Sequence, residues 1–159
     1  MRLRDASPGT PERGSIVRAR DYVVVLALAL LWGGLLAMAI RQPGYTDAYY
    51  YYNAGQRLAT GQGLTDPYLW TYIHAPEDLP GPSHMFWMPL ESLVAAAAMV
   101  IGGATFGVAQ VPSVVCFALL VSTAFWLGAA IGQTQRRAWI AALLVLFSGF
   151  FTPFWTTTD

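Results

Sequence analysis

The apolar residues of this chain fall into four long stretches separated by polar segments. The first stretch covers residues 22–40 (YVVVLALALLWGGLLAMAI) and contains no charged residue. Its length matches the roughly 20 residues that a helix needs to cross a bilayer. Three further stretches follow at 85–107, 111–132 and 138–155. This pattern predicts an all-α membrane protein, because a single apolar segment in lipid can pair all its backbone N–H and C=O groups by forming a helix.

A cleaved signal peptide is the alternative interpretation of residues 22–40, because Ala37-Met38-Ala39 resembles a cleavage site. The apolar part of a signal peptide is shorter, roughly 7–15 residues, and more apolar stretches follow here. We therefore interpret 22–40 as a transmembrane helix. Composition agrees, since 11% of the residues are charged, compared with roughly 25% in soluble domains.

The arginines indicate how many stretches cross the membrane. Residues 1–21 are polar, contain five Arg and are expected to form a disordered cytoplasmic tail. If 85–107 crossed the membrane, Arg136 and Arg137 would lie outside, against the positive-inside rule. The uninterrupted apolar run within 85–107 covers only residues 93–101, which suits an interfacial helix better than a span. We therefore predict three spans, with four as the alternative.

The resulting topology places the N-terminus in the cytoplasm of a multi-pass protein of the cell (inner or plasma) membrane. The spans are 22–40, 111–132 and 138–155, and the cytoplasmic loop is 133–137. Residues 41–110 form a long outer loop that bears interfacial helices at about 47–59 and 89–101. Residues 156–159 begin a second outer loop. Because the chain stops directly after an apolar stretch, we expect it to be the N-terminal portion of a longer protein.

The strongest local signal is the segment 44–63, GYTDAYYYYNAGQRLATGQG. Thr46 or Asp47 can cap a helix, and Gly61 can close it. Tyr50, Ala54 and Leu58 recur at four-residue spacing, so they share one helix face, which we expect to lie along the membrane surface. A plain helix cap with no further role is the alternative to a functional Asp47.

This segment resembles the first outer loop of GT-C glycosyltransferases, a membrane superfamily that includes protein mannosyltransferases, aminoarabinose transferases and oligosaccharyltransferases. Members carry an acidic residue after the first span and then an aromatic helix rich in small residues. The matching positions here are Asp47, Tyr49, Tyr50, Ala54, Leu58, Gly61 and Gly63. The segment 83–90, SHMFWMPL, is similar to the start of the family's second outer helix, although Met88 stands where a Pro is usual. Asp159 matches a second outer acidic residue by its position.

The resemblance implies a reaction. The donor is a sugar on a polyprenyl phosphate, and the acceptor is a hydroxyl or amide on a glycan, lipid or protein at the outer face of the bilayer. Asp47 is the implied general base and Asp159 the second acid. Two carboxylates suit Mg²⁺ or Mn²⁺, yet several branches of the family work without metal, so the cofactor stays open. Tyr49 and Tyr50 are expected to bind substrate.

Arg57 and His84 are further candidates for substrate binding. The guanidinium of Arg57 can bind a phosphate through two hydrogen bonds. The alternative interpretation is an arginine at the membrane interface whose charged end reaches water and that has no binding role. His84 can bind phosphate or donate a proton to the leaving group, and its alternative is an interface histidine without such a role.

Other functional classes fit the sequence less well. No basic run is interleaved with aromatic residues, so no nucleic-acid partner is expected. A transporter would carry ionisable residues inside its spans, and the three predicted spans contain none. A non-catalytic transport or assembly subunit and an inactive truncated remnant remain the alternatives, because GT-C enzymes have many more spans than this chain.

Overall fold

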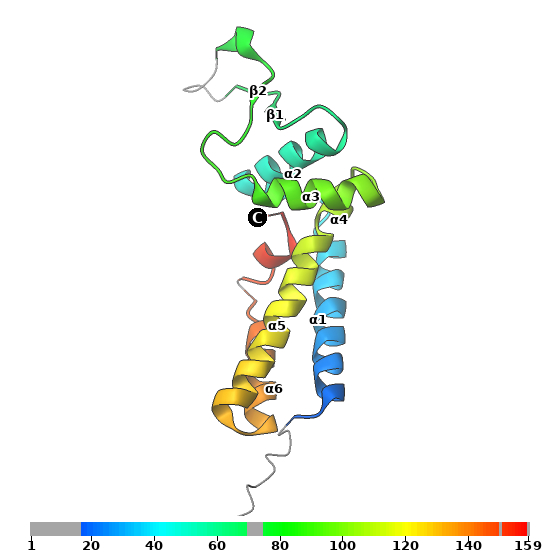
Figure 1. Ribbon diagram of the computed structural model, residues 1–159, viewed down its shortest axis with the longest axis vertical. Coiled ribbons are helices and arrows are strands. Elements are labelled where there is room, and N and C mark those ends of the chain that lie inside the picture. Colours follow the sequence, from blue (N-terminus) through cyan, green and yellow to red (C-terminus); the bar gives the residue numbers. More distant parts are fainter. Residues whose placement is uncertain (1–16, 70–74, 150, 159) are drawn as a thin grey trace, which may run out of the picture.

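Two long apolar helices lie side by side and form a rod, and a layer of shorter elements covers one end of it (Figure 1). The computed structural model describes residues 17–69, 75–149 and 151–158. The helices are α1 (Ala19–Ala39), α2 (Thr46–Ala59), α3 (Leu90–Gly102), α4 (Phe106–Ala109), α5 (Val111–Gly132) and α6 (Gln135–Leu146). Short 3-10 turns are η1 (Pro76–Asp78) and η2 (Phe154–Thr156), and two short strands are β1 (Thr65–Asp66) and β2 (Gly81–Pro82).

The rod consists mainly of α1 and α5. With 21 and 22 residues, these helices are about 32 and 33 Å long at 1.5 Å per residue, compared with about 30 Å for the hydrocarbon core of a bilayer. In their apolar windows, 17% and 28% of the residues are buried. Two helices in the described part of the chain are therefore long and apolar enough to cross a membrane, and most residues in these windows are not buried within the protein.

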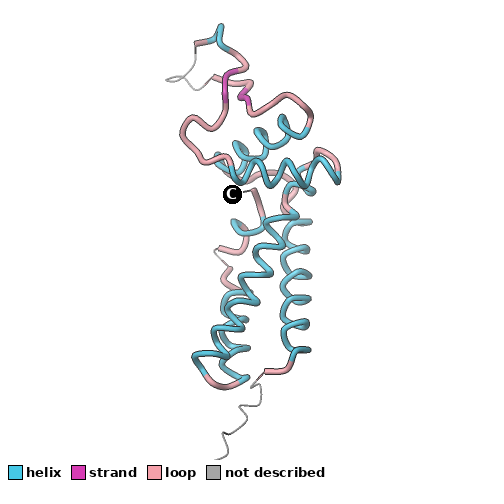
Figure 2. The backbone as a smooth tube through the Cα atoms, in the orientation of Figure 1, coloured by secondary structure: helices cyan, strands magenta, loops and turns pink. Residues whose placement is uncertain are grey.

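The third predicted span, 138–155, does not form one continuous helix. Helix α6 ends at Leu146, and the Ser148 hydroxyl donates to the Val145 carbonyl at 2.8 Å where the helix stops. Gly149 and Pro153 follow, and both disfavour helix continuation. The chain then continues in the direction of α6, through irregular backbone and η2, toward the end of the rod where α2 and α3 lie (Figure 2).

Helices α5 and α6 form a tight antiparallel pair. A Cβ atom at Gly128 would lie 2.8 Å from the Ala141 Cβ and 2.9 Å from the Ala138 Cα. The turn between the helices uses Gln133 at φ 53°, and the Thr134 side chain accepts the Arg137 backbone N–H. Small residues thus allow the two backbones to approach closely, as is common between helices in membranes.

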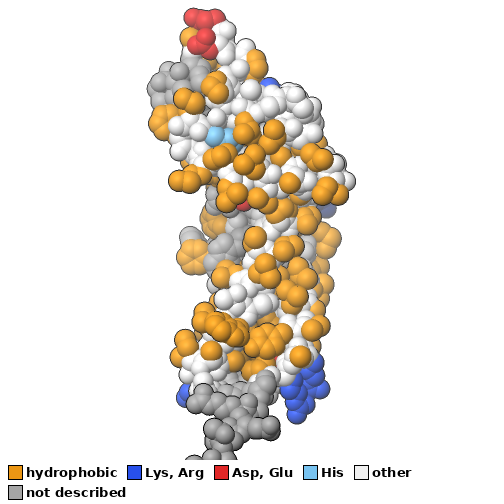
Figure 3. Space-filling view, in the orientation of Figure 1, with side chains coloured by type: hydrophobic (Ala, Val, Ile, Leu, Met, Phe, Trp, Pro, Cys, Tyr) orange, Lys and Arg blue, Asp and Glu red, His pale blue; other side chains and the backbone are white. Residues whose placement is uncertain are grey.

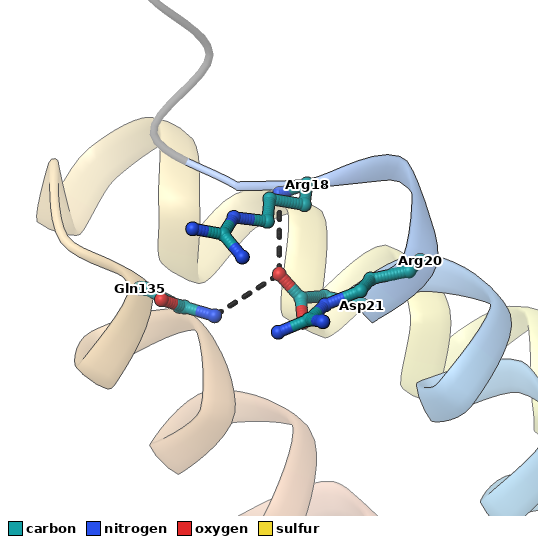
Figure 4. A network of polar contacts seen from close by, with 4 residues as sticks. All are labelled: Arg18, Arg20, Asp21 and Gln135. Atoms are coloured by element: carbon teal, nitrogen blue, oxygen red, sulfur yellow. Dashed lines mark hydrogen bonds and ion pairs between the residues drawn. The ribbon is translucent and has the colours of Figure 1, made fainter.

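Asp21 is buried at the end of the rod where α1 and α6 begin, and it links these two helices (Figure 4). Its Oδ2 accepts the Arg18 backbone N–H at 3.1 Å and the Gln135 Nε2 at 3.0 Å. Helix α1 therefore begins at Ala19, three residues before the predicted span, and residues 19–21 are helical where a disordered tail was expected. The bond to Gln135 joins the start of α1 to the start of α6.

Four of the six arginines among the described residues lie at this end of the rod. Arg18 and Arg20 flank the start of α1, and Arg136 and Arg137 lie in the first turn of α6. Figure 3 shows the blue arginine side chains below a rod covered mainly by hydrophobic side chains, with acidic side chains at the opposite tip. The exposed Glu77 and Asp78 of η1 belong to the loop at that tip.

Helices α2 and α3 cross the opposite end of the rod, where α1 ends and α5 begins (Figure 1). Their bounds, Thr46–Ala59 and Leu90–Gly102, lie close to the predicted 47–59 and 89–101. A helix of 13 residues is about 20 Å long, so α3 is too short to span a bilayer, and it lies between α2 and the rod (Figure 1). The antiparallel pair β1–β2, with Asp66 opposite Gly81, was not predicted.

The seam between α2 and α3 is closely packed. A Cβ atom at Gly55 would lie 2.9 Å from the Ser92 carbonyl oxygen, and the Ser92 hydroxyl donates to the Tyr51 carbonyl at 3.0 Å. Tyr50 and Ala54 are also buried within the protein. The expectation that the Tyr50–Ala54 face lies along the membrane surface is therefore wrong, since protein covers it.

We predict that Gly128→Ala lowers the stability of the protein by about 1–3 kcal/mol, because the added methyl group overlaps α6 and forces the pair apart. Gly34→Ala is the matched control, since a Cβ there meets nothing within 4 Å and alanine favours the helix. Thermal unfolding in detergent measures both. Equal melting temperatures for the two variants would contradict the close α5–α6 contact.

Candidate functional site

Helix α2 carries most of the predicted site residues, and its two ends are built differently. At its C-terminal end Gly61 has φ 79°, the Gly61 N–H donates to the Leu58 carbonyl and the Gln62 N–H donates to the Arg57 carbonyl. This is a Schellman motif, and the predicted role of Gly61 in closing the helix is confirmed.

At the N-terminal end, the predicted capping role of Thr46 or Asp47 is wrong. The N-cap residue is Tyr45, and no side chain caps the helix. Asp47 stands in the first turn, where the helix dipole favours a negative charge. It is partly buried, and its carboxylate makes no hydrogen bond within the described part of the chain. The carboxylate is therefore not committed to a structural contact there.

A cavity of about 560 Å³ opens beside this first turn. Its lining residues are Tyr45, Thr46, Tyr49, Tyr50, Asn53 and Tyr68. We call it the tyrosine cavity. It brings the predicted Tyr49 and Tyr50 together, whereas Asp47 lies in the same helical turn but is not among the lining residues. Such a volume and a mainly aromatic lining with a few polar groups are typical of small-molecule sites.

His84 is held inside an aromatic cluster behind the cavity. Its ring packs at centroid distances of 5.0 Å from Tyr50 and 6.2 Å from Tyr51, and Trp87 packs at 5.0 Å from Tyr50. The Tyr50 hydroxyl accepts the His84 backbone N–H. His84 has φ 62°, which is uncommon for a residue with a side chain and occurs where the surroundings enforce it.

The His84 ring is arranged to stay neutral. Its Nδ1 lies 3.2 Å from the Trp87 carbonyl oxygen, so Nδ1 carries the proton and Nε2 the lone pair. Nε2 is buried and has no hydrogen-bond partner among the described residues. Burial lowers the pKa of His84, and the bond to Trp87 and the charge of Asp66 oppose that shift only in part.

Asp66 is a site residue that the sequence did not reveal. It is 2% exposed, lies in β1 and is hydrogen-bonded with Tyr68 of the cavity wall. Burial, followed by the charge of Asp66, raises the pKa of Tyr68, and burial is also the main cause of the raised pKa of Tyr50. An acid in a loop rich in Gly and Pro looks solvated in the sequence, and no local signal announces its pairing with Gly81.

Arg57 lies in a second cavity, of about 290 Å³, on the same helix. We call this the polar cavity. It is lined by Asn53, Gln56, Arg57, Thr60, Gln62 and Pro67. The Arg57 Nε donates to the Thr65 hydroxyl at 2.9 Å, and Arg57 forms no ion pair within the described ranges. Asn53 lines both cavities, which are therefore neighbours along α2.

The last described residues return to the first turn of α2. The Thr158 hydroxyl donates to the Ala48 carbonyl at 2.9 Å, and the Tyr45 and Phe154 rings lie 5.1 Å apart. Gln110 Nε2 also donates to the Thr156 carbonyl at 2.9 Å. Asp159, the second predicted acid, lies outside the described residues. The segment that precedes it packs against the residue that follows Asp47.

Over the part of the chain that the structure describes, no group of three or more His, Cys, Asp or Glu side chains could hold a metal ion. Comparison of the chain with protein-family models, curated protein sequences and solved structures gives no match. The resemblance to GT-C glycosyltransferases therefore rests on the sequence motifs alone.

We predict that acid destabilises the His84 cluster. A histidine whose folded pKa lies below its ordinary value of 6.5 takes up a proton more readily when the protein unfolds, so stability falls as the pH drops below about 6.5, by up to about 1.4 kcal/mol for each unit of pKa depression. His84→Asn tolerates the positive φ and does not titrate. Urea unfolding of both proteins at pH 5 and pH 7 should show a smaller pH effect in the variant.

All other titrating groups are shared by the two proteins, so the difference between them isolates His84. The same loss of stability between pH 7 and pH 5 in wild type and variant would show that the ring is not held neutral by burial.

Proposed function

We propose that this chain is the N-terminal part of a membrane glycosyltransferase of GT-C type. Helices α1 and α5 cross the bilayer, and α6 with the segment up to η2 makes a third passage. The exposed apolar surface of α1 and α5 supports this, since lipid is the environment that covers such a surface at least cost. The arginine end of the rod faces the cytoplasm, so α2 and α3 lie at the outer face.

The observation that carries the proposal is the tyrosine cavity in the same helical turn as Asp47. Its walls combine four tyrosine rings with Thr46 and Asn53. Rings offer flat apolar faces to the C–H groups of a sugar, and hydroxyl and amide groups satisfy its hydroxyls. A site at this end of the rod lies at the depth of lipid headgroups, where the sugar of a polyprenyl-phosphate donor is presented.

The proposed reaction is transfer of that sugar to an acceptor hydroxyl or amide. Asp47 takes the acceptor proton, the acceptor atom forms a bond to the anomeric carbon, and the bond from that carbon to the phosphate oxygen breaks. The polyprenyl phosphate leaves with the electron pair. Asp47 suits the role of base because its carboxylate is partly exposed and makes no hydrogen bond within the described chain.

The remaining predicted residues have supporting roles in this proposal. Tyr49 and Tyr50 bind the reacting sugars, His84 keeps Tyr50 in place and Arg57 binds substrate. Asp159 is the second acid, supported by the contact of Thr158 with Ala48 beside Asp47. No metal is assigned, and a donor pocket between further helices of a longer protein completes the site.

We predict that Asp47→Asn lowers the rate of sugar transfer by about 10²–10⁴-fold, the usual contribution of a positioned base. Membranes containing the protein and a radiolabelled polyprenyl-phosphate sugar, incubated with a cell-envelope glycan extract, provide the measurement. Glu77→Gln is the control, because Glu77 is an exposed acid of the same loop.

Asp47→Asn keeps the shape of the side chain, and unchanged thermal stability would establish that the variant is folded. A folded Asp47→Asn protein with full activity would remove Asp47 from the reaction. Absence of transfer by the wild-type protein under all donor conditions would favour a non-catalytic subunit instead.

A further inference from the structure

The tyrosine cavity and the polar cavity are two parts of one strip along α2. Thr46, Tyr49, Asn53, Arg57 and Thr60 follow one another at spacings of three or four residues, so they share one face of the helix. The first three line the tyrosine cavity, and the last three line the polar cavity. At 1.5 Å per residue the strip is about 21 Å long, several times the width of one sugar ring.

This strip lies on the side of α2 that faces away from α3. The side of α2 that meets α3 contains Tyr51 and Gly55, which contact Ser92. With 3.6 residues per turn, Asn53 and Arg57 point to nearly the opposite side of α2. Because the Thr46 end of α2 packs on the segment around η2 and α3 covers the opposite side of the helix, the Arg57 end of the strip is the part that is reached from the aqueous phase rather than from the lipid.

The chemistry changes along the strip. At the Thr46 end the walls are mainly tyrosine rings. At the other end stand the guanidinium of Arg57 and the amide and hydroxyl groups of Asn53, Gln62 and Thr60. The Arg57 Nε is bonded to Thr65, which fixes the plane of the guanidinium and leaves its terminal N–H groups without an acidic partner among the described residues. A partly buried, unpaired cation of this kind selects an oxyanion.

We propose that the strip binds an elongated, water-soluble oligosaccharide acceptor that carries a negative charge, and that Arg57 recognises this charge. The acceptor hydroxyl lies at the Thr46 end near Asp47, and the anionic group lies ten residues along the helix, about 15 Å away. This inference rests on the proposed function only in calling the bound oligosaccharide the acceptor of the sugar transfer. The binding surface itself is defined by the two cavities and their shared Asn53.

The test is binding of defined oligosaccharides to the intact protein in nanodiscs of phosphatidylcholine. The probes are trigalacturonate, maltotriose as a neutral trisaccharide and galacturonate as a single charged unit. We expect trigalacturonate to bind about tenfold more tightly than maltotriose, because charge-assisted hydrogen bonds to a guanidinium give at least this difference. It should also bind more tightly than galacturonate, because a single sugar cannot reach both cavities. Arg57→Gln should remove the preference for trigalacturonate while leaving maltotriose binding unchanged.

Arg41→Gln is the matched control, since Arg41 is an exposed arginine between α1 and α2 that lines neither cavity. It should leave trigalacturonate binding within about twofold of wild type, a change below 1 kcal/mol. Retained maltotriose binding shows that Arg57→Gln is folded. Tyr49→Ala should weaken trigalacturonate and maltotriose alike.

Three results would overturn the proposal. Trigalacturonate could bind no better than maltotriose, Arg57→Gln could keep the preference, or Arg57→Gln could weaken only undecaprenyl phosphate added to the disc, which would make the oxyanion that of the lipid donor. Because the readout is binding, failure of Asp47 as the catalytic base leaves this result standing, and loss of the charge preference leaves the catalytic proposal standing.

Discussion

The close packing of α2 on α3 at Gly55 is the contact on which the site depends. A side chain at Gly55 would meet the Ser92 carbonyl, so only glycine lets the two helices cross at this distance. The Ser92 hydroxyl, bonded to the Tyr51 carbonyl, fixes the same crossing through a polar group that would otherwise be buried without a partner. Together they hold α2 above α3, and α2 carries the tyrosine cavity at one end and the polar cavity further along.

This arrangement gives the rod two chemically different ends. Asp21 joins the start of α1 to Gln135 at the start of α6, so the arginines of both segments lie together, while the polar loop and both cavities lie at the other end. Between the ends, the surface of α1 and α5 is apolar and exposed. A bilayer fits this distribution, because it covers the apolar surface and leaves the arginines at the starts of α1 and α6 in water on one side and the two cavities in water on the other.

The sequence was sufficient for features set by local signals. Apolar length predicted α1 and α5, and Gly61 marked the end of α2. The sequence did not predict the features that depend on contacts between segments far apart in the chain. Tyr45, whose ring packs on that of Phe154, is the N-cap in place of Thr46 and Asp47. The apolar stretch 138–155 suggested one helix, although Gly149 and Pro153 break it. Asp66 was missed since its burial depends on β2 and Tyr68, and Arg57 was recognised as a candidate by chemistry alone, without its cavity.

Accessibility of introduced cysteines tests most directly whether the rod spans a membrane with α2 and α3 outside. The single Cys116 is first replaced by serine, and Thr60→Cys and Gln133→Cys are then made separately, at exposed positions at opposite ends of the rod. In intact cells a membrane-impermeant maleimide should label Thr60→Cys and should label Gln133→Cys only after lysis. Labelling of Gln133→Cys in intact cells, or equal labelling of both positions, would contradict the topology on which the proposed site depends.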